Sequence, residues 1–154
     1  MTPASDLLRQ EHRRIEGHLD PMLEALQHLT PEAVGEVRRH FQAIQSIARV
    51  HFRREEEIFY PRLRTVDPHL LEEMDGQHED TRQADRDLEE LLAGLPAVPS
   101  ERQFTELHRL GIFFHDFVQT HILAEEEHLF TLADEEMRPE EQQALCSEMQ
   151  QVKE

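Results

Sequence analysis

The chain has 154 residues, 38% of them apolar and 32% charged, and a formal net charge of −17. This length suits one domain with a single core, and the acidic excess excludes the basic footprint of a nucleic-acid-binding protein. Because no apolar run approaches membrane-spanning length, no signal-peptide pattern is present and the only cysteine is Cys146, we expect a cytoplasmic protein without disulfides.

Apolar residues at helical spacing predict five helices in chain order. The first covers residues 4–29, the second runs from Thr30-Pro31 to about residue 64, and the third starts at Asp67-Pro68 and ends before the loop 94–99. Ser100 caps the fourth, which reaches Leu132, and Arg138-Pro139 starts a short fifth. Four long helices with short connections predict an all-α fold, an antiparallel up-down-up-down four-helix bundle. We expect residues 1–136 to form the bundle, with the C-terminal helix of residues 137–154 packed on it or extending from it.

One motif occurs twice in the chain. His51 is followed by three other residues and then by Glu55-Glu56-Glu57, and His121 stands in the same relation to Glu125-Glu126-Glu127, seventy residues later. On a helix, positions i and i+4 lie on the same face, one turn apart. Each copy can therefore present an imidazole and a carboxylate to one point, as metal ligands do.

Two further histidines, His12 and His78, lie on the inward stripes of the first and third predicted helices. In an antiparallel bundle, four positions lie at the same depth, about nine residues or roughly 13 Å from the same end. They are His12, Glu55, His78 and Glu125. Each half of the chain thus supplies one lone histidine and one His-x-x-x-Glu pair. The pattern predicts a two-metal site with pseudo-twofold symmetry, in which Glu55 and Glu125 are placed to bridge.

The donor set indicates the metal. Imidazole and carboxylate suit iron, and the lack of thiolate ligands argues against a structural zinc site. Six protein donors on two Fe ions leave positions for oxo or hydroxo bridges and for O₂, NO or peroxide. The predicted ligands are His12, His51, Glu55, His78, His121 and Glu125.

These motifs resemble the haemerythrin-like (HHE cation-binding) family, and in particular its bacterial members. The resemblance covers about residues 5–134 and rests on Glu11-His12-x-x-Ile15, His51-Phe52-x-x-Glu55-Glu56, Gln77-His78-Glu79 and His121-x-x-x-Glu125-Glu126. It implies a non-haem di-iron centre that binds O₂ or related small molecules.

The chain departs from the O₂-carrying members in two places. They have His-x-x-x-His on the third helix, where this chain has Arg82, which cannot ligate a cation. Their fourth-helix carboxylate follows the histidine by five residues. Here Glu125 lies about 40° from His121 around the helix and Glu126 about 140°, so Glu125 is favoured and Glu126 is the alternative. The lost imidazole favours peroxide, NO or oxidase-type chemistry over reversible O₂ carriage.

Four residues near the predicted ligands have two interpretations each. In one interpretation, Arg82 and Asp85 form an ion pair that fills the space of the missing ligand. In the other interpretation, Arg82 stabilises a bound anion and Asp85 fixes the position of its guanidinium group. His128 lies one turn beyond Glu125 and either lines the mouth of the site or is solvated. Tyr60 either packs in the core or bonds to a ligand.

The favoured function is binding of O₂, NO or peroxide for sensing, scavenging or storage. The alternative is an enzyme on the same centre, either peroxidase-like, NO-reducing or donating iron for iron–sulfur cluster repair. A third hypothesis is a non-catalytic interaction module that docks through the fifth helix. Turnover stays open, and we expect a monomer or homodimer with no nucleic-acid or membrane partner.

Overall fold

The computed structural model describes residues 2–153, which contain helices and no strand. Four rods make up most of the chain, and two of them are divided by a short π-helical segment labelled η. The elements are α1 (Ala4–Gln27), α2 (Pro31–Arg54), η1 (Glu55–Phe59), α3 (Tyr60–Leu63), α4 (Pro68–Gly94), α5 (Glu101–Ala124), η2 (Glu125–Leu129), α6 (Phe130–Glu136) and α7 (Pro139–Gln150).

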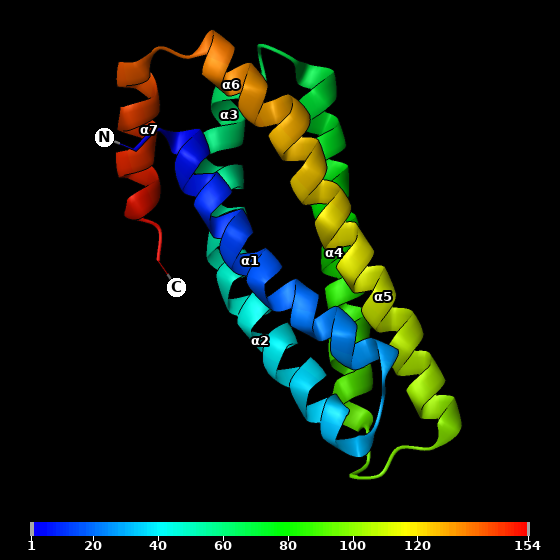
Figure 1. Cartoon of the computed structure of the whole chain (residues 1–154). Coiled ribbons are helices and arrows are strands. Elements are labelled where there is room, and N and C mark those ends of the chain that lie inside the picture. The colour runs from blue at the N-terminus through cyan, green and yellow to red at the C-terminus, as the bar shows by residue number, and fades with distance from the viewer. Residues whose placement is uncertain (1, 154) are drawn as a thin grey trace.

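The rods form the predicted antiparallel bundle (Figure 1). Helices α1 and α4 run in one direction, and α2 and α5 run in the other. Helix α1 packs against α2 and α5, and α4 packs against α5, whereas α2 and α4 touch only sparsely. The short helix α7 lies at one end, against α1 and η1. The all-α fold with a short C-terminal helix is therefore confirmed.

Three predicted N-caps form at helix starts. The side chains of Thr30 and Asp67 each accept a hydrogen bond, 3.1 Å long, from the backbone N–H three residues on. Ser100 forms a capping box with Gln103, in which each side chain bonds to the other residue's backbone N–H. These bonds satisfy N–H groups that have no partner within the helix, and they fix where α2, α4 and α5 begin.

The second and fourth rods are not α-helical throughout. Each contains one π-helical segment, which starts at Glu55 in one rod and at Glu125 in the other. The N–H of Tyr60 bonds to the carbonyl of Glu55, and that of Phe130 to the carbonyl of Glu125. A π turn adds a residue to the turn and so rotates all that follows. Pro61 lacks an N–H, but η2 contains no proline, so proline does not explain both segments.

Two apolar clusters fill the bundle. One, around Phe41, Leu88 and Phe114, lies toward the α1–α2 and α4–α5 loops. The other, around Phe59 and Phe130, lies at the opposite end and includes side chains of α7. Between them is a layer of buried polar side chains formed by Glu11, His12, His51, Glu55, His78, His121 and Glu125.

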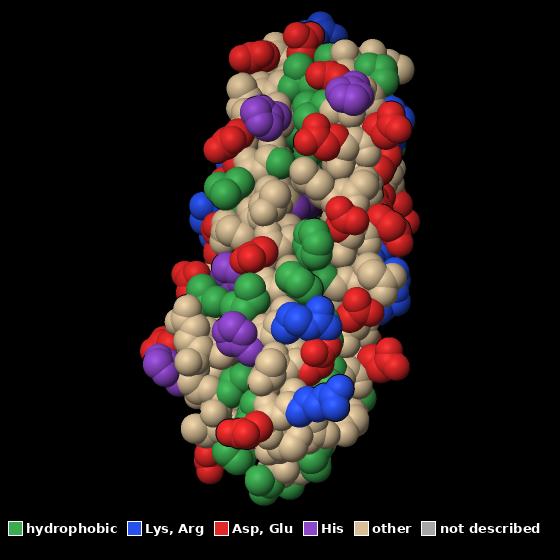
Figure 2. Space-filling model, turned by 90° about the vertical axis from the view of Figure 1, so that its right-hand side faces the viewer, with side chains coloured by type: hydrophobic (Ala, Val, Ile, Leu, Met, Phe, Trp, Pro, Cys, Tyr) green, Lys and Arg blue, Asp and Glu red, His purple; other side chains and the backbone are tan. Residues whose placement is uncertain are grey.

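The outer surface is mainly acidic. Figure 2 shows the face on the α5 side, where Asp and Glu side chains are spread over the whole view and Lys and Arg form no large patch. Within residues 2–153, no helix combines the length and the apolar character needed to cross a membrane.

Candidate metal centre

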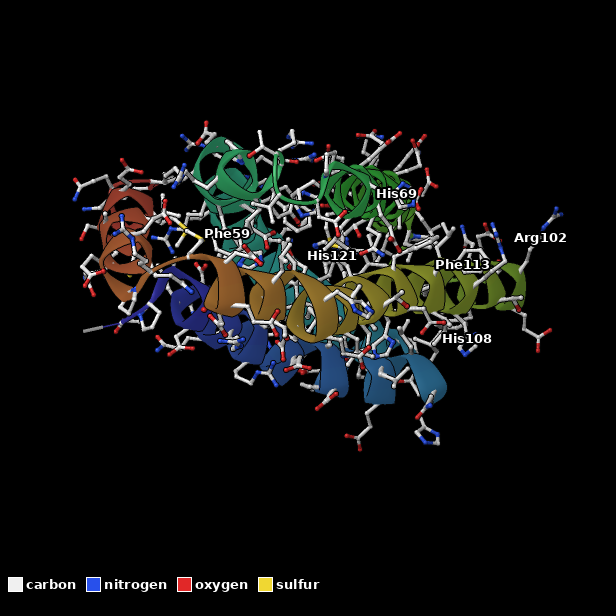
Figure 3. The ribbon with its side chains drawn as sticks, turned by 90° about the horizontal axis from the view of Figure 1, so that it is seen from above. Phe59, His69, Arg102, His108, Phe113 and His121 are labelled. Atoms are coloured by element: carbon white, nitrogen blue, oxygen red, sulfur yellow. The ribbon has the colours of Figure 1, made fainter. Side chains whose placement is uncertain are left out.

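The structure brings all six predicted ligands together inside the bundle, each at most 3% exposed. In the view from above, His121 points into the interior, while Arg102, at the far end of α5, projects outward (Figure 3). The ligands form two groups that share Glu55 and Glu125. The donor atoms within each group lie within 4.8 Å of one another, and the groups are His12, His51, Glu55, Glu125 and Glu55, His78, His121, Glu125.

The Nε2 atoms of the four imidazoles face the two shared carboxylates. Oε1 of Glu55 lies 3.0 Å from Nε2 of His78 and 3.3 Å from Nε2 of His51. Oε1 of Glu125 lies 3.0 Å from Nε2 of His12 and 3.2 Å from Nε2 of His121. Each carboxylate therefore meets one histidine of its own rod and one from another helix.

Three donor atoms in this layer are buried without a hydrogen-bond partner among the described residues. They are Nε2 of His51, Nε2 of His121 and Oε2 of Glu55. Buried polar atoms without partners are costly and rare in folded proteins. Because they converge with other imidazole and carboxylate donors, a bound cation is a fitting partner for them.

The Nδ1 atoms of the same imidazoles each have a polar partner on the outer side. Glu126 lies 2.7 Å from Nδ1 of His12, and Glu56 lies 2.9 Å from Nδ1 of His78. For the other two histidines, the partners are Glu11 at 3.1 Å from His51 Nδ1 and Gln77 at 2.8 Å from His121 Nδ1. Such partners hold the Nδ1–H tautomer and leave Nε2 free for a metal.

Arginines back the three outer carboxylates. Arg82 donates to both oxygens of Glu56, at 2.6 and 2.8 Å. Arg13 pairs with Glu126 and Arg54 pairs with Glu11. The fourth outer partner, the amide of Gln77, is neutral, so the His78–His121 group has one fewer charged partner than the His12–His51 group.

Tyr60 adds a hydroxyl to one side of the site only. Its O–H donates to Oε2 of Glu125 at 2.6 Å, and the Tyr60 hydroxyl oxygen also lies 3.0 Å from Nε2 of His78. Burial and the nearby carboxylates of Glu125 and Glu55 raise the pKa of Tyr60 well above its ordinary value. The phenol therefore keeps its proton. Its counterpart seventy residues on is Phe130, which stacks on His12 with ring centroids 5.3 Å apart.

The carboxylates set the charge of the imidazoles. Burial alone lowers the pKa of His51 and of His121, but the nearby glutamates outweigh it. They raise the pKa of His51 well above its ordinary value and that of His121 to about 9. Burial similarly opposes ionisation of Glu125, yet His121 and His12 hold its pKa well below the usual range. Without a cation, the cluster neutralises its carboxylates by holding protons on imidazoles.

The predicted pairing of Arg82 with Asp85 is wrong, and of the two interpretations of His128 the structure supports the solvated one. Arg82 does not pair with Asp85: it bonds to Glu56, while Asp85 accepts from Gln45 Nε2 at 2.7 Å. His128 lies outside the cluster, with its side chain 63% exposed and its Nε2 3.9 Å from Oε2 of Glu127. The π turn that starts at Glu125 explains this position, because its extra residue rotates His128 away from the inward face. Asp85 and Arg82 still lie near the centre, as part of a cavity wall.

Sequence reasoning missed the outer partners Glu11, Glu56 and Gln77, and it considered Glu126 as an alternative metal ligand to Glu125. Each of these residues is adjacent in sequence to a predicted ligand. Adjacent helical residues are about 100° apart, so a stripe drawn through the ligands leaves them out. They reach a histidine on a different helix instead. The available signal was that Glu56 and Glu126 occupy the same place in both copies of the repeated motif.

One comparison with known proteins gave a match. A family model described as "Hemerythrin HHE cation binding domain" matches residues 4–133. No curated protein and no solved structure matches the chain significantly. The matched segment contains all six predicted ligands and ends within α6, so it excludes α7.

Proposed function

The chain belongs to the hemerythrin HHE cation-binding family, and from this premise we propose that it is a di-iron protein that binds O₂, NO or peroxide for sensing, scavenging or storage. The cluster of histidines and glutamates is compatible with metal binding. The observation that carries the proposal is the pair of donor groups with shared carboxylates, in which three buried atoms have no hydrogen-bond partner among the described residues.

The donor types support iron. One ion would be held by His12 and His51 and the other by His78 and His121, with Glu55 and Glu125 available to both. Imidazole with carboxylate, and no thiolate, is a ligand set that binds iron well. Once bound, two iron ions supply electron exchange and coordination positions for a diatomic molecule or peroxide.

The chain's own residues prepare the site for that ligand. The outer carboxylates and Gln77 orient the imidazoles, and the apolar clusters on both sides keep bulk water away. The Tyr60 hydroxyl holds a proton next to Glu125. This proton favours a second candidate function, a peroxidase-like or NO-reducing enzyme on the same centre, because the reduction of peroxide and that of NO both consume protons.

Metal analysis of the purified protein tests the proposal. After expression with sufficient iron, we expect two irons per chain and a visible absorption band that changes on adding O₂, NO or peroxide. His51→Ala and His121→Ala should each lower the iron content, while the matched control His108→Ala, at an exposed position, should not. A wild-type protein that binds one iron or none would refute it. Turnover with an added reductant would decide in favour of the enzyme.

A further inference from the structure

A cavity of about 250 Å³ lies next to the histidine layer, inside the half of the bundle opposite α7. Its walls come from α1, α2, α4 and α5. Most of the wall is apolar, and one end is formed by the imidazole rings of His12, His51 and His121. The main apolar residues are Ile15, Ile44, Phe52, Phe114, Val118 and Ile122.

The cavity is much larger than the small ligands proposed for the centre. An apolar protein cavity of about 150 Å³ stays dry and encloses a benzene molecule. At about 250 Å³, this cavity has room for a ring with substituents. A diatomic molecule or peroxide would leave most of it empty, and packed interiors rarely keep such space.

The charged side chains in the wall have partners of their own. Arg82 is paired with Glu56, and Arg53 lies 3.4 Å from Glu57. Asp85 accepts a hydrogen bond from Gln45, and burial raises the pKa of its carboxyl group, which favours the uncharged form. Because these charges are already matched, the wall offers no strong selection for an ionic ligand, and a neutral one fits it better.

The cavity can be reached between α2 and α4. These two helices touch only sparsely, unlike the other neighbouring pairs. The polar wall residues Gln45, Arg49, Arg82 and Asp85 lie on α2 and α4, where Arg49 is exposed and the others are half-buried. A ligand would enter by displacing long, flexible side chains rather than by separating packed apolar surfaces.

We propose that this cavity binds a neutral, apolar organic molecule of about one substituted aromatic ring, held against the rings of His12, His51 and His121. The binding itself needs no metal. Its consequence, that the molecule is an organic effector or co-substrate of the centre, rests on the proposed function.

Toluene binding to the metal-free protein is the first test. We expect saturable binding of one toluene per chain by calorimetry, and NMR cross-peaks from toluene to methyl groups of Ile15, Ile44, Val118 and Ile122. Ala48→Phe places a ring in the cavity and should weaken toluene binding at least tenfold. The matched control Ala93→Phe, at an exposed position outside the wall, should leave it unchanged.

The results separate this inference from the proposed function. Failure of wild-type protein to bind toluene, or cross-peaks only to methyl groups elsewhere, would overturn it. Binding of xenon without toluene would reduce the cavity to a gas pocket and would also overturn it. If Ala48→Phe does not fold, the wild-type cross-peaks decide. Toluene binding by a protein that takes up no iron would support ligand binding in the cavity and refute the di-iron function. Iron uptake without toluene binding would support the di-iron function and refute ligand binding in the cavity.

Discussion

Replacing Glu56 with Gln should weaken metal binding although Glu56 is not a predicted ligand. The Glu56 carboxylate lies 2.9 Å from Nδ1 of His78 and accepts two hydrogen bonds from Arg82. Glutamine keeps the shape and one acceptor oxygen but removes the charge. It would give His78 the kind of neutral partner that His121 already has in Gln77.

The size of the effect follows from the charge at this position. Burial raises the pKa of Glu56, but His78 and Arg82 outweigh it and bring the pKa from 4.5 to about 2. A shift of this size corresponds to at most roughly 3 kcal/mol. Because the side chain is 32% exposed, solvent screening reduces this to roughly 1–2 kcal/mol. Loss of an outer partner typically costs about 10- to 100-fold in metal affinity, or roughly 1.4–2.7 kcal/mol.

The assay is a competition between protein and a coloured chelator for Fe(II) under anaerobic conditions. Glu57→Gln is the matched control, since Glu57 is exposed and pairs with Arg53. We expect Glu56→Gln to lose about 10- to 100-fold in affinity and Glu57→Gln to match wild type. An unchanged affinity in Glu56→Gln would refute the view that outer carboxylates strengthen the centre.

The same pKa gives a stability prediction for the metal-free protein. A carboxyl group with a lowered folded-state pKa stabilises the fold above its unfolded value, and this contribution disappears as pH falls through the folded value. The unfolding free energies of wild type and Glu56→Gln should therefore differ at pH 6 and converge between about pH 4.5 and 2, as measured by urea denaturation. A constant difference across that range would exclude this cause.

Three more outcomes are expected. Loading the metal-free protein at pH 7 should release protons, because the pKa of His121 is raised to about 9, those of His51 and His78 are raised as well, and metal binding displaces ligand protons; calorimetry in buffers of different ionisation enthalpy measures this, and no release would contradict it. Tyr60→Phe should lower the unfolding free energy of the metal-free protein by about 1–2 kcal/mol, because the hydroxyl bonds to buried Glu125; equal urea midpoints would show that the bond contributes nothing. Deleting residues 137–154 removes three buried apolar side chains of α7, those of Leu145, Cys146 and Met149, and should cost at least about 3 kcal/mol by the same measurement, whereas an unchanged midpoint would show that α7 is dispensable for folding.

The extent to which the sequence predicts the site depends on the range of the interactions. His51 and Glu55 are one helical turn apart, so their shared face follows from helix geometry alone, and counting from helix ends places His12 and His78 at the same depth. The bond between His51 and Glu11 joins residues forty apart in the chain, and no local spacing encodes it. The two π turns were also missed, because side-chain spacing carries little information about one extra backbone residue. The cavity was missed since it reflects volume that the side chains leave unfilled.

The division of the donors between the two halves of the chain has a mechanical consequence. Glu125, from the α4–α5 hairpin, belongs to the same group as His12 and His51 of the α1–α2 hairpin, and Glu55 crosses in the opposite direction to His78 and His121. Neither hairpin alone contains a complete group. Each bound ion would therefore cross-link the two hairpins. Separating the hairpins would require breaking the bonds that Glu55 and Glu125 make to the ion of the opposite hairpin, in addition to the loss of apolar packing.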